Sequence, residues 1–216
     1  MAELTTRLYL MSPVITDETA FAPQLADACA TGGIAAVLLH FDAADERALV
    51  NKVKTLAPVA QGHGAAAIIT VIGEVDLAAV AVRSGADGVH TGAGPNEVRG
   101  LRERLKGDRI VGAGNIRSKH EAMTIGEAEA DYVMFGESRA DGSVPPLAAV
   151  VERASWWAEI FQTPCVAYAP DLDSVAQVAR TGAEFVALGG AVWSHPDGPA
   201  AAIAAALDLC ATETAH

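Results

Sequence analysis

The chain has 216 residues, of which 51 % are hydrophobic, and this length and composition suit one globular domain with a sizeable core. It carries 15 Lys and Arg against 27 Asp and Glu, and the net charge of −12 argues against nucleic acid or an anionic membrane as a partner. Three scattered cysteines, no signal-peptide pattern and no long apolar run together predict a reduced, cytoplasmic protein that does not span a membrane.

Short apolar runs alternate with amphipathic segments along the whole chain. The expected strands cover 7–12, 34–41, 65–72, 86–91, 108–114, 131–136, 163–169 and 184–190, and a helical pattern follows each of them. These runs are continuous and rich in β-branched residues, as is typical of strands buried on both faces. The alternation predicts a single (β/α)8 TIM barrel over residues 1–216. A doubly wound sheet is the alternative, but its G-x-G-x-x-G turn is missing after the first strand.

Four helix-to-strand junctions repeat one pattern. The clearest copy is SGADGVHTG at 84–92, and its glycine position recurs as Gly33, Glu129 and Gly182. A residue just beyond a helix end commonly adopts a positive φ, which favours glycine. We therefore interpret Gly85 as a helix cap and only HTGAG, residues 90–94, as part of a functional face.

Histidines stand where three of the expected strands or their loops end. TIM barrels form their active sites at the carboxyl ends of the strands. His40, His90 and His120 are the candidate catalytic residues, because imidazole titrates near neutral pH. With Asp42, the first two would also form a two-His, one-carboxylate metal set. The alternative is that His40 and Asp42 only hydrogen-bond each other or the loop backbone.

Basic side chains gather at one part of the expected barrel mouth. Arg117, Lys119 and His120 follow the fifth strand, and Arg139 follows the sixth. They are the candidates to bind an anionic substrate in an otherwise acidic protein. The alternative is a solvated first helical turn with Ser118 as its N-cap.

The stretch ALGGAVW at 187–193 offers a second way to hold an anion. Gly190 and Ala191 present unhindered backbone N–H groups ahead of a helix, an arrangement that binds phosphate in many barrels. The alternative is that the glycines only permit a tight turn.

Several segments resemble the thiamine phosphate synthase family and its thiazole tautomerase relatives. They are RLYLMSP, TGGIAAVLL, VDLAAVAVRSGADGVHTG, EADYVMFG and TGAEFVAL, in the family's order through nearly the whole chain. The VDLA…GADGVH…G block is the most specific. The resemblance implies a (β/α)8 barrel that joins an aminopyrimidine diphosphate to a thiazole phosphate and releases Mg²⁺-bound diphosphate.

The motifs that the resemblance implies for the diphosphate and Mg²⁺ are replaced. Leu38, His40 and Asp42 stand where the family has Gln, Arg and Lys. Gly73 stands where it has one Mg²⁺ ligand, and residues 93–95 replace the stretch with the second. Without these cations and carboxylates the leaving diphosphate is poorly neutralised, which argues against synthase chemistry. No metal ligand is assigned, and the cofactor stays open.

Three functions follow. The first is a family member of thiamine metabolism that binds a small phosphorylated thiazole or pyrimidine at the barrel mouth, with synthase activity only if other basic residues grip the diphosphate. The second is a diverged paralogue acting as a binding protein or acid–base isomerase. The third is a metal-dependent lyase or hydrolase using His40, Asp42 and His90. We also expect a mobile loop at 137–146. Trp156 and Trp157 are interpreted either as packing residues or as a contact in a homo-oligomer.

Overall fold

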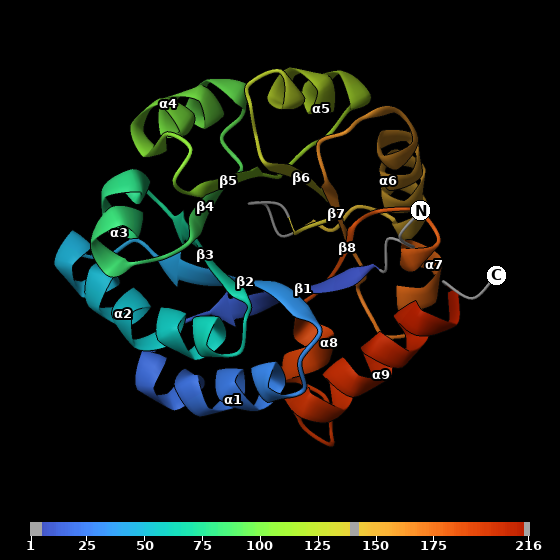
Figure 1. The fold of residues 1–216 in the computed structure, drawn as a ribbon, viewed down its shortest axis with the longest axis horizontal. Helices are drawn as coiled ribbons and strands as arrows, with labels where there is room; N and C mark the ends of the chain where they lie inside the picture. Colours follow the sequence, from blue (N-terminus) through green and yellow to red (C-terminus); the bar gives the residue numbers. More distant parts are fainter. Residues whose placement is uncertain (1–5, 139–142, 214–216) are drawn as a thin grey trace.

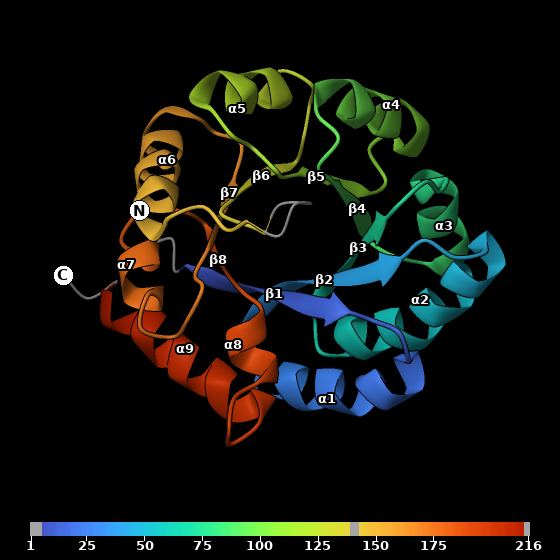
Figure 2. The same cartoon turned by 180° about the vertical axis from the view of Figure 1, so that it is seen from behind.

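A closed barrel of parallel strands forms the centre of the computed structural model, which describes residues 6–138 and 143–213. Each strand pairs with the next along the chain, and β8 returns to pair with β1. Figures 1 and 2 show this ring from its two sides. The predicted (β/α)8 architecture is confirmed. The strands are β1 (Arg7–Val14), β2 (Ile34–Asp42), β3 (Ala66–Ile72), β4 (Gly88–Thr91), β5 (Ile110–Ala113), β6 (Tyr132–Phe135), β7 (Cys165–Tyr168) and β8 (Phe185–Leu188).

Helices surround the barrel on its outside (Figure 1). None of them within the described ranges has both the length and the hydropathy of a membrane span. One short helix after β8 was not predicted from the sequence. The helices are α1 (Glu18–Ala30), α2 (Glu46–Gly62), α3 (Leu77–Ser84), α4 (Pro95–Leu105), α5 (Lys119–Gly126), α6 (Leu147–Ile160), α7 (Val175–Ala179), the short α8 (Gly190–Trp193) and α9 (Pro199–Glu213).

The apolar core has two layers because strand side chains alternate between the barrel interior and the helices. The outer layer packs strand residues against helix residues. For example, Phe135 of β6 lies against Trp157 of α6 with ring centroids 6.1 Å apart, and both are fully buried. The inner layer is smaller and contains two tyrosines. Its members are Tyr9, Met11, Ala36, Leu38, Ile68, Tyr132, Met134, Val166 and Ala187.

The repeated junctions have the backbone that their sequence predicts. Gly33, Gly85 and Gly182 have φ of 74°, 80° and 81°, and Glu129 adopts 65° at the equivalent place. Gly85 is the C-cap of α3, as predicted.

Strands β3 to β8 each begin one or two residues later than predicted. A carboxylate directly precedes β4, β6 and β8, and it accepts a backbone N–H at the start of the strand before it: Asp87 from Ala67 at 2.7 Å, Asp131 from Val111 at 2.7 Å and Glu184 from Cys165 at 2.8 Å.

Candidate active site

The carboxyl ends of the strands open into a pocket of about 710 Å³. Met11, Val14 and Ile72 give one part of its wall an apolar surface, and histidines, amides and hydroxyls line the rest. Neither Lys nor Arg is among the residues that line it in the described part of the chain. The pocket is thus at the predicted face but has little positive charge.

His90, on β4, is the most buried titratable side chain of this wall. It is 4 % exposed, and both of its ring nitrogens have partners. Nε2 lies 3.0 Å from a carboxylate oxygen of Glu137, and Nδ1 lies 2.9 Å from the Tyr132 hydroxyl. That hydroxyl lies 2.6 Å from the hydroxyl of Tyr9. We call Tyr9, Tyr132, His90 and Glu137 the buried hydrogen-bond chain.

Two glycines next to the buried hydrogen-bond chain make its geometry possible. His90, Gly112 and Tyr132 are register neighbours across β4, β5 and β6, so Tyr132 reaches His90 over Gly112. A Cβ added to Gly112 would overlap the Tyr132 ring, and one added to Gly114 would overlap the Glu137 carboxylate. Side chains two residues apart share a face of the strand. The sequence Gly112-x-Gly114 therefore leaves room on the inner face for two side chains from the β6 segment.

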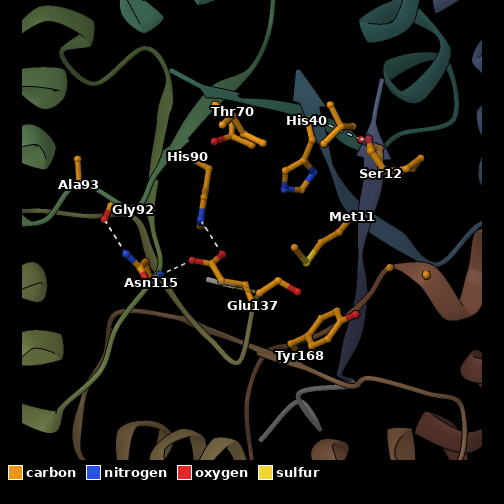
Figure 3. Close-up of a pocket in the computed structure, with 16 residues that line it drawn as sticks. Met11, Ser12, His40, Thr70, His90, Gly92, Ala93, Asn115, Glu137 and Tyr168 are labelled. Carbon is orange, nitrogen blue, oxygen red and sulfur yellow. Dashed lines mark hydrogen bonds and ion pairs between the residues drawn. The ribbon is translucent and has the colours of Figure 1, made fainter. Parts of the chain in front are cut away.

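Glu137 is fixed from two sides. One carboxylate oxygen bonds His90, and the other accepts the backbone N–H of Asn115. Asn115 adopts an uncommon φ of 55°, and its side-chain amide donates to the Gly92 carbonyl at 3.3 Å. Figure 3 shows this network on one side of the pocket with the His40 ring opposite. The carboxylate is held in place at the edge of the cavity.

His40 faces the same cavity from β2. Its backbone N–H donates to the Ser12 hydroxyl at 2.9 Å, whereas its Nδ1 is buried and has no hydrogen-bond partner among the described residues. Burial, helped by the nearby His90, lowers the pKa of His40 to about 4. Its imidazole is therefore neutral near pH 7. Asn115 Oδ1 is likewise buried and unpartnered there. A ligand with hydrogen-bonding groups would satisfy both atoms.

The metal set considered for His40, Asp42 and His90 is not assembled. His90 is bonded to Glu137 and Tyr132, and Asp42 is exposed. Across residues 6–138 and 143–213, no three His, Cys, Asp or Glu side chains are arranged to hold a metal ion.

The pocket also does not fit a Mg²⁺-bound diphosphate. Glu137 is the single carboxylate among its described lining residues, and neither Lys nor Arg lines the pocket there to balance the remaining phosphate charge. Gly73 cannot provide a ligand through a side chain. Protein-bound Mg²⁺ usually relies on one or two available carboxylates as well as phosphate oxygens.

The predicted basic cluster lies beside the pocket and is not part of its described lining. Lys119 pairs with Glu152 at 3.0 Å and lies 5.2 Å from the centre of the Trp156 ring, on the surface between α5 and α6. Arg117 and His120 are exposed. An anion-binding role for these side chains stays a prediction.

Ser118 caps α5, as the alternative interpretation of this segment predicted. Its hydroxyl accepts the N–H of Glu121 at 3.1 Å, and the Glu121 carboxylate accepts the N–H of Arg117 at 2.8 Å. Arg139 and the centre of the predicted mobile loop lie outside the described residues.

The predicted phosphate-binding backbone is at the pocket wall. Gly190 lines the cavity and starts α8, directly before Ala191. A Cβ on Gly190 would meet nothing within 4 Å, so there is open space beside this residue. The first N–H groups of a helix have no acceptor inside it. Their use for phosphate remains a prediction.

The sequence of the chain is similar to a family model and to the sequences of known proteins. The family model described as "Thiamine monophosphate synthase" matches residues 8–192. The thiamine-phosphate synthase of Rhodospirillum centenum is 40 % identical over 200 residues, covering 92 % of this chain and 94 % of that protein. The thiamine-phosphate synthase of Hyphomonas neptunium is 35 % identical, with 93 % and 91 % covered.

Solved structures match the fold. Thiamine phosphate pyrophosphorylase from Pyrococcus furiosus has a TM-score of 0.77 at 21 % identity, and 99 % of each chain is covered. A 3-hexulose-6-phosphate synthase has a TM-score of 0.69 at 15 % identity, with 94 % of this chain and 99 % of that one covered. At these identities the likeness concerns the barrel architecture alone.

Proposed function

The chain belongs to the thiamine monophosphate synthase family, and on that premise we propose that it binds a phosphorylated thiazole or pyrimidine of thiamine biosynthesis and transfers a proton on it. The observation that carries the proposal is the Glu137 carboxylate, held by His90 and Asn115 at the edge of a pocket without a described Lys or Arg. Such a wall suits proton transfer better than departure of a diphosphate.

The proposed step needs no reactant other than the ligand. A ligand C–H or N–H bond breaks, its proton moves to a Glu137 oxygen, and the electron pair of the bond stays on the ligand. Glu137 then returns a proton to another ligand atom, which completes an isomerisation. Positioned acid–base groups of this kind accelerate a reaction by about 10²–10⁴-fold. His40, neutral and on the facing wall, is the second proton donor or acceptor.

We assign the phosphate of the ligand to the end of β8. The backbone N–H groups of Gly190 and Ala191 at the start of α8 add no charge but would supply two donors to an anion. One phosphate is easier to accept there than two, because Glu137 repels additional negative charge.

The synthase reaction itself is the second candidate. The relatives at 40 % and 35 % identity carry the name thiamine-phosphate synthase, and this favours it. In this chain the diphosphate would need cations from outside the described lining, and Arg117 and Arg139 are the candidates.

Separate calorimetric titrations with thiazole phosphate, with the aminopyrimidine monophosphate, and with the aminopyrimidine diphosphate plus Mg²⁺ test the proposal. The mixture is then assayed for thiamine phosphate. We expect binding of the thiazole phosphate, or of the pyrimidine as its monophosphate, and no product. Product would establish the second candidate, and no binding of any of these ligands would overturn the proposal.

A matched pair of variants tests the phosphate position. Gly190→Asp adds a negative charge in open space and should weaken binding at least about tenfold. Gly190→Ala adds only a methyl group there, so it should change the affinity little. Equal effects of the two substitutions would place the phosphate elsewhere.

A further inference from the structure

Tyr9 and Tyr132 are polar groups inside a barrel whose interior is otherwise apolar. They are 2 % and 6 % exposed, and neither lines the pocket. Their hydroxyls extend the bond between His90 and Glu137 inward, from the cavity edge to β1. The proposed function uses Glu137 and does not explain why two tyrosines are buried behind it.

Glu137 determines which groups donate and which accept along the buried hydrogen-bond chain. An ionised carboxylate can only accept, so His90 Nε2 carries a proton and donates it to Glu137. With a neutral imidazole, Nδ1 is then an acceptor. Tyr132 donates to Nδ1, and Tyr9 donates to the Tyr132 oxygen. Every hydroxyl proton and both ring nitrogens are satisfied in this direction.

The opposite direction leaves a buried donor without a partner. If His90 were protonated at both nitrogens, Nδ1 would donate to Tyr132, and Tyr132 would donate to Tyr9. The Tyr9 proton would then lack an acceptor, because the described residues show only Tyr132 beside this hydroxyl. An unsatisfied buried donor is costly in free energy.

We propose that Tyr9 and Tyr132 are positioning residues that hold His90 as the neutral Nε2–H tautomer, so that His90 donates to Glu137 on the pocket side. A fixed donor keeps the Glu137 carboxylate oriented toward the ligand. The functional meaning rests on the proposed proton transfer at Glu137, whereas the tautomer itself is a property of the free protein.

The protonation of the groups around His90 agrees with the assignment of the neutral Nε2–H tautomer. Burial raises the pKa values of Tyr9 and Tyr132 well above 10, so both hydroxyls keep their protons. Asp131, close to Tyr132, acts in the same direction. On the pocket side His90 faces Glu137, and His40, which is near enough to influence it, is neutral near pH 7.

Imidazole ¹⁵N NMR of the ligand-free protein tests the proposal, with substitution of His90 by Gln to assign the signals. We expect a protonated Nε2 and an unprotonated Nδ1 for His90 near neutral pH. Tyr132→Phe removes the donor to Nδ1 and should therefore increase the share of His90 that is protonated at Nδ1 near neutral pH. Tyr9→Phe leaves the Tyr132 donor in place, so it should keep the tautomer.

Tyr168→Phe is the matched control, since Tyr168 is the one tyrosine that is not part of the buried hydrogen-bond chain. This substitution should leave the His90 signals unchanged. A protonated Nδ1 in the wild-type protein would overturn the proposal. So would a Tyr132→Phe variant in which Nδ1 of His90 is protonated no more than in the wild type. Because no ligand is needed, the tautomer can be established even if the proposed isomerisation fails.

Discussion

At the scale of single residues, the site depends on two glycines as much as on the polar side chains. Gly112 and Gly114 leave the space in which Tyr132 and Glu137 reach across β5 toward His90. A small side chain on β5 would close that space. The polar residues alone would then not produce the observed geometry.

Gly114→Ala should displace Glu137 from His90, because the new Cβ would overlap its carboxylate. We expect ligand proton transfer to fall at least about tenfold, as expected when a general base is misplaced. Gly100→Ala is the matched control, since a Cβ at this helical position meets nothing within 4 Å.

The control Gly100→Ala should stabilise the protein by about 0.5–1 kcal/mol, the usual gain for Ala over Gly in a helix. Urea unfolding and the rate assay are measured on both variants. A Gly114→Ala enzyme with wild-type activity would show that Glu137 does not need its present position.

At the scale of elements, the junction between each helix and the next strand has a fixed backbone requirement. Gly85 and Glu129 both adopt left-handed conformations, at φ of 80° and 65°. For a side-chain-bearing residue this conformation costs about 1–2 kcal/mol. The junction at Glu129 is therefore less stable than it would be with glycine at this position.

Exchanging the residue types at these two junctions should change stability in opposite directions. Glu129→Gly should raise the free energy of unfolding by about 0.5–1 kcal/mol, because part of the relief is offset by the greater freedom of glycine in the unfolded chain. Gly85→Ala should lower it by about 1–2 kcal/mol, although a Cβ there has open space around it. Denaturant unfolding measures both, and a destabilised Glu129→Gly variant would contradict this interpretation.

The elements themselves could be predicted from the sequence because continuous apolar runs and helix-end glycines are local signals. The exact strand starts could not, since they depend on pairing with strands that are distant in the sequence. The four-residue helix α8 (Gly190–Trp193) is too short to give a periodic pattern.

The candidate site was predictable in its location and in part of its composition. His40 and His90 stand at strand ends, and both line the pocket. The pairing of His90 with Glu137, 47 residues apart, was not foreseen, because it depends on the space over Gly112 and Gly114. Glycines at alternate positions of a barrel strand are the signal that would have pointed to it.

At the scale of the whole molecule, His40 should make stability depend on pH. Its pKa is about 4 in the folded protein against an ordinary 6.5, so the unfolded chain binds a proton more readily between these values. Stability should therefore fall as the pH drops from about 6.5 to about 4, by about 1.4 kcal/mol per pH unit from this group. The His40→Gln variant should show a shallower fall in urea unfolding, and an unchanged slope would contradict the assignment.

The three cysteines should be inert in the folded protein. Cys29, Cys165 and Cys210 are buried, and burial raises the pKa values of their thiols to about 11, 12 and 11. A thiol reagent at about pH 8 should modify none of them before unfolding and all three afterwards, because the thiolate is the reactive form. Rapid modification of a native cysteine would show that the barrel opens more readily than its packing indicates.

The most direct measurement is the exchange of ligand protons with deuterated solvent, followed by NMR on thiazole phosphate in the presence of the wild-type protein and its Glu137→Gln variant. We expect the wild-type protein to catalyse exchange at a carbon of the ligand, and the variant to lose at least about 99 % of this rate, the lower end of the usual range for a lost general base. Bound ligand without exchange, or equal exchange with both proteins, would contradict proton transfer at Glu137.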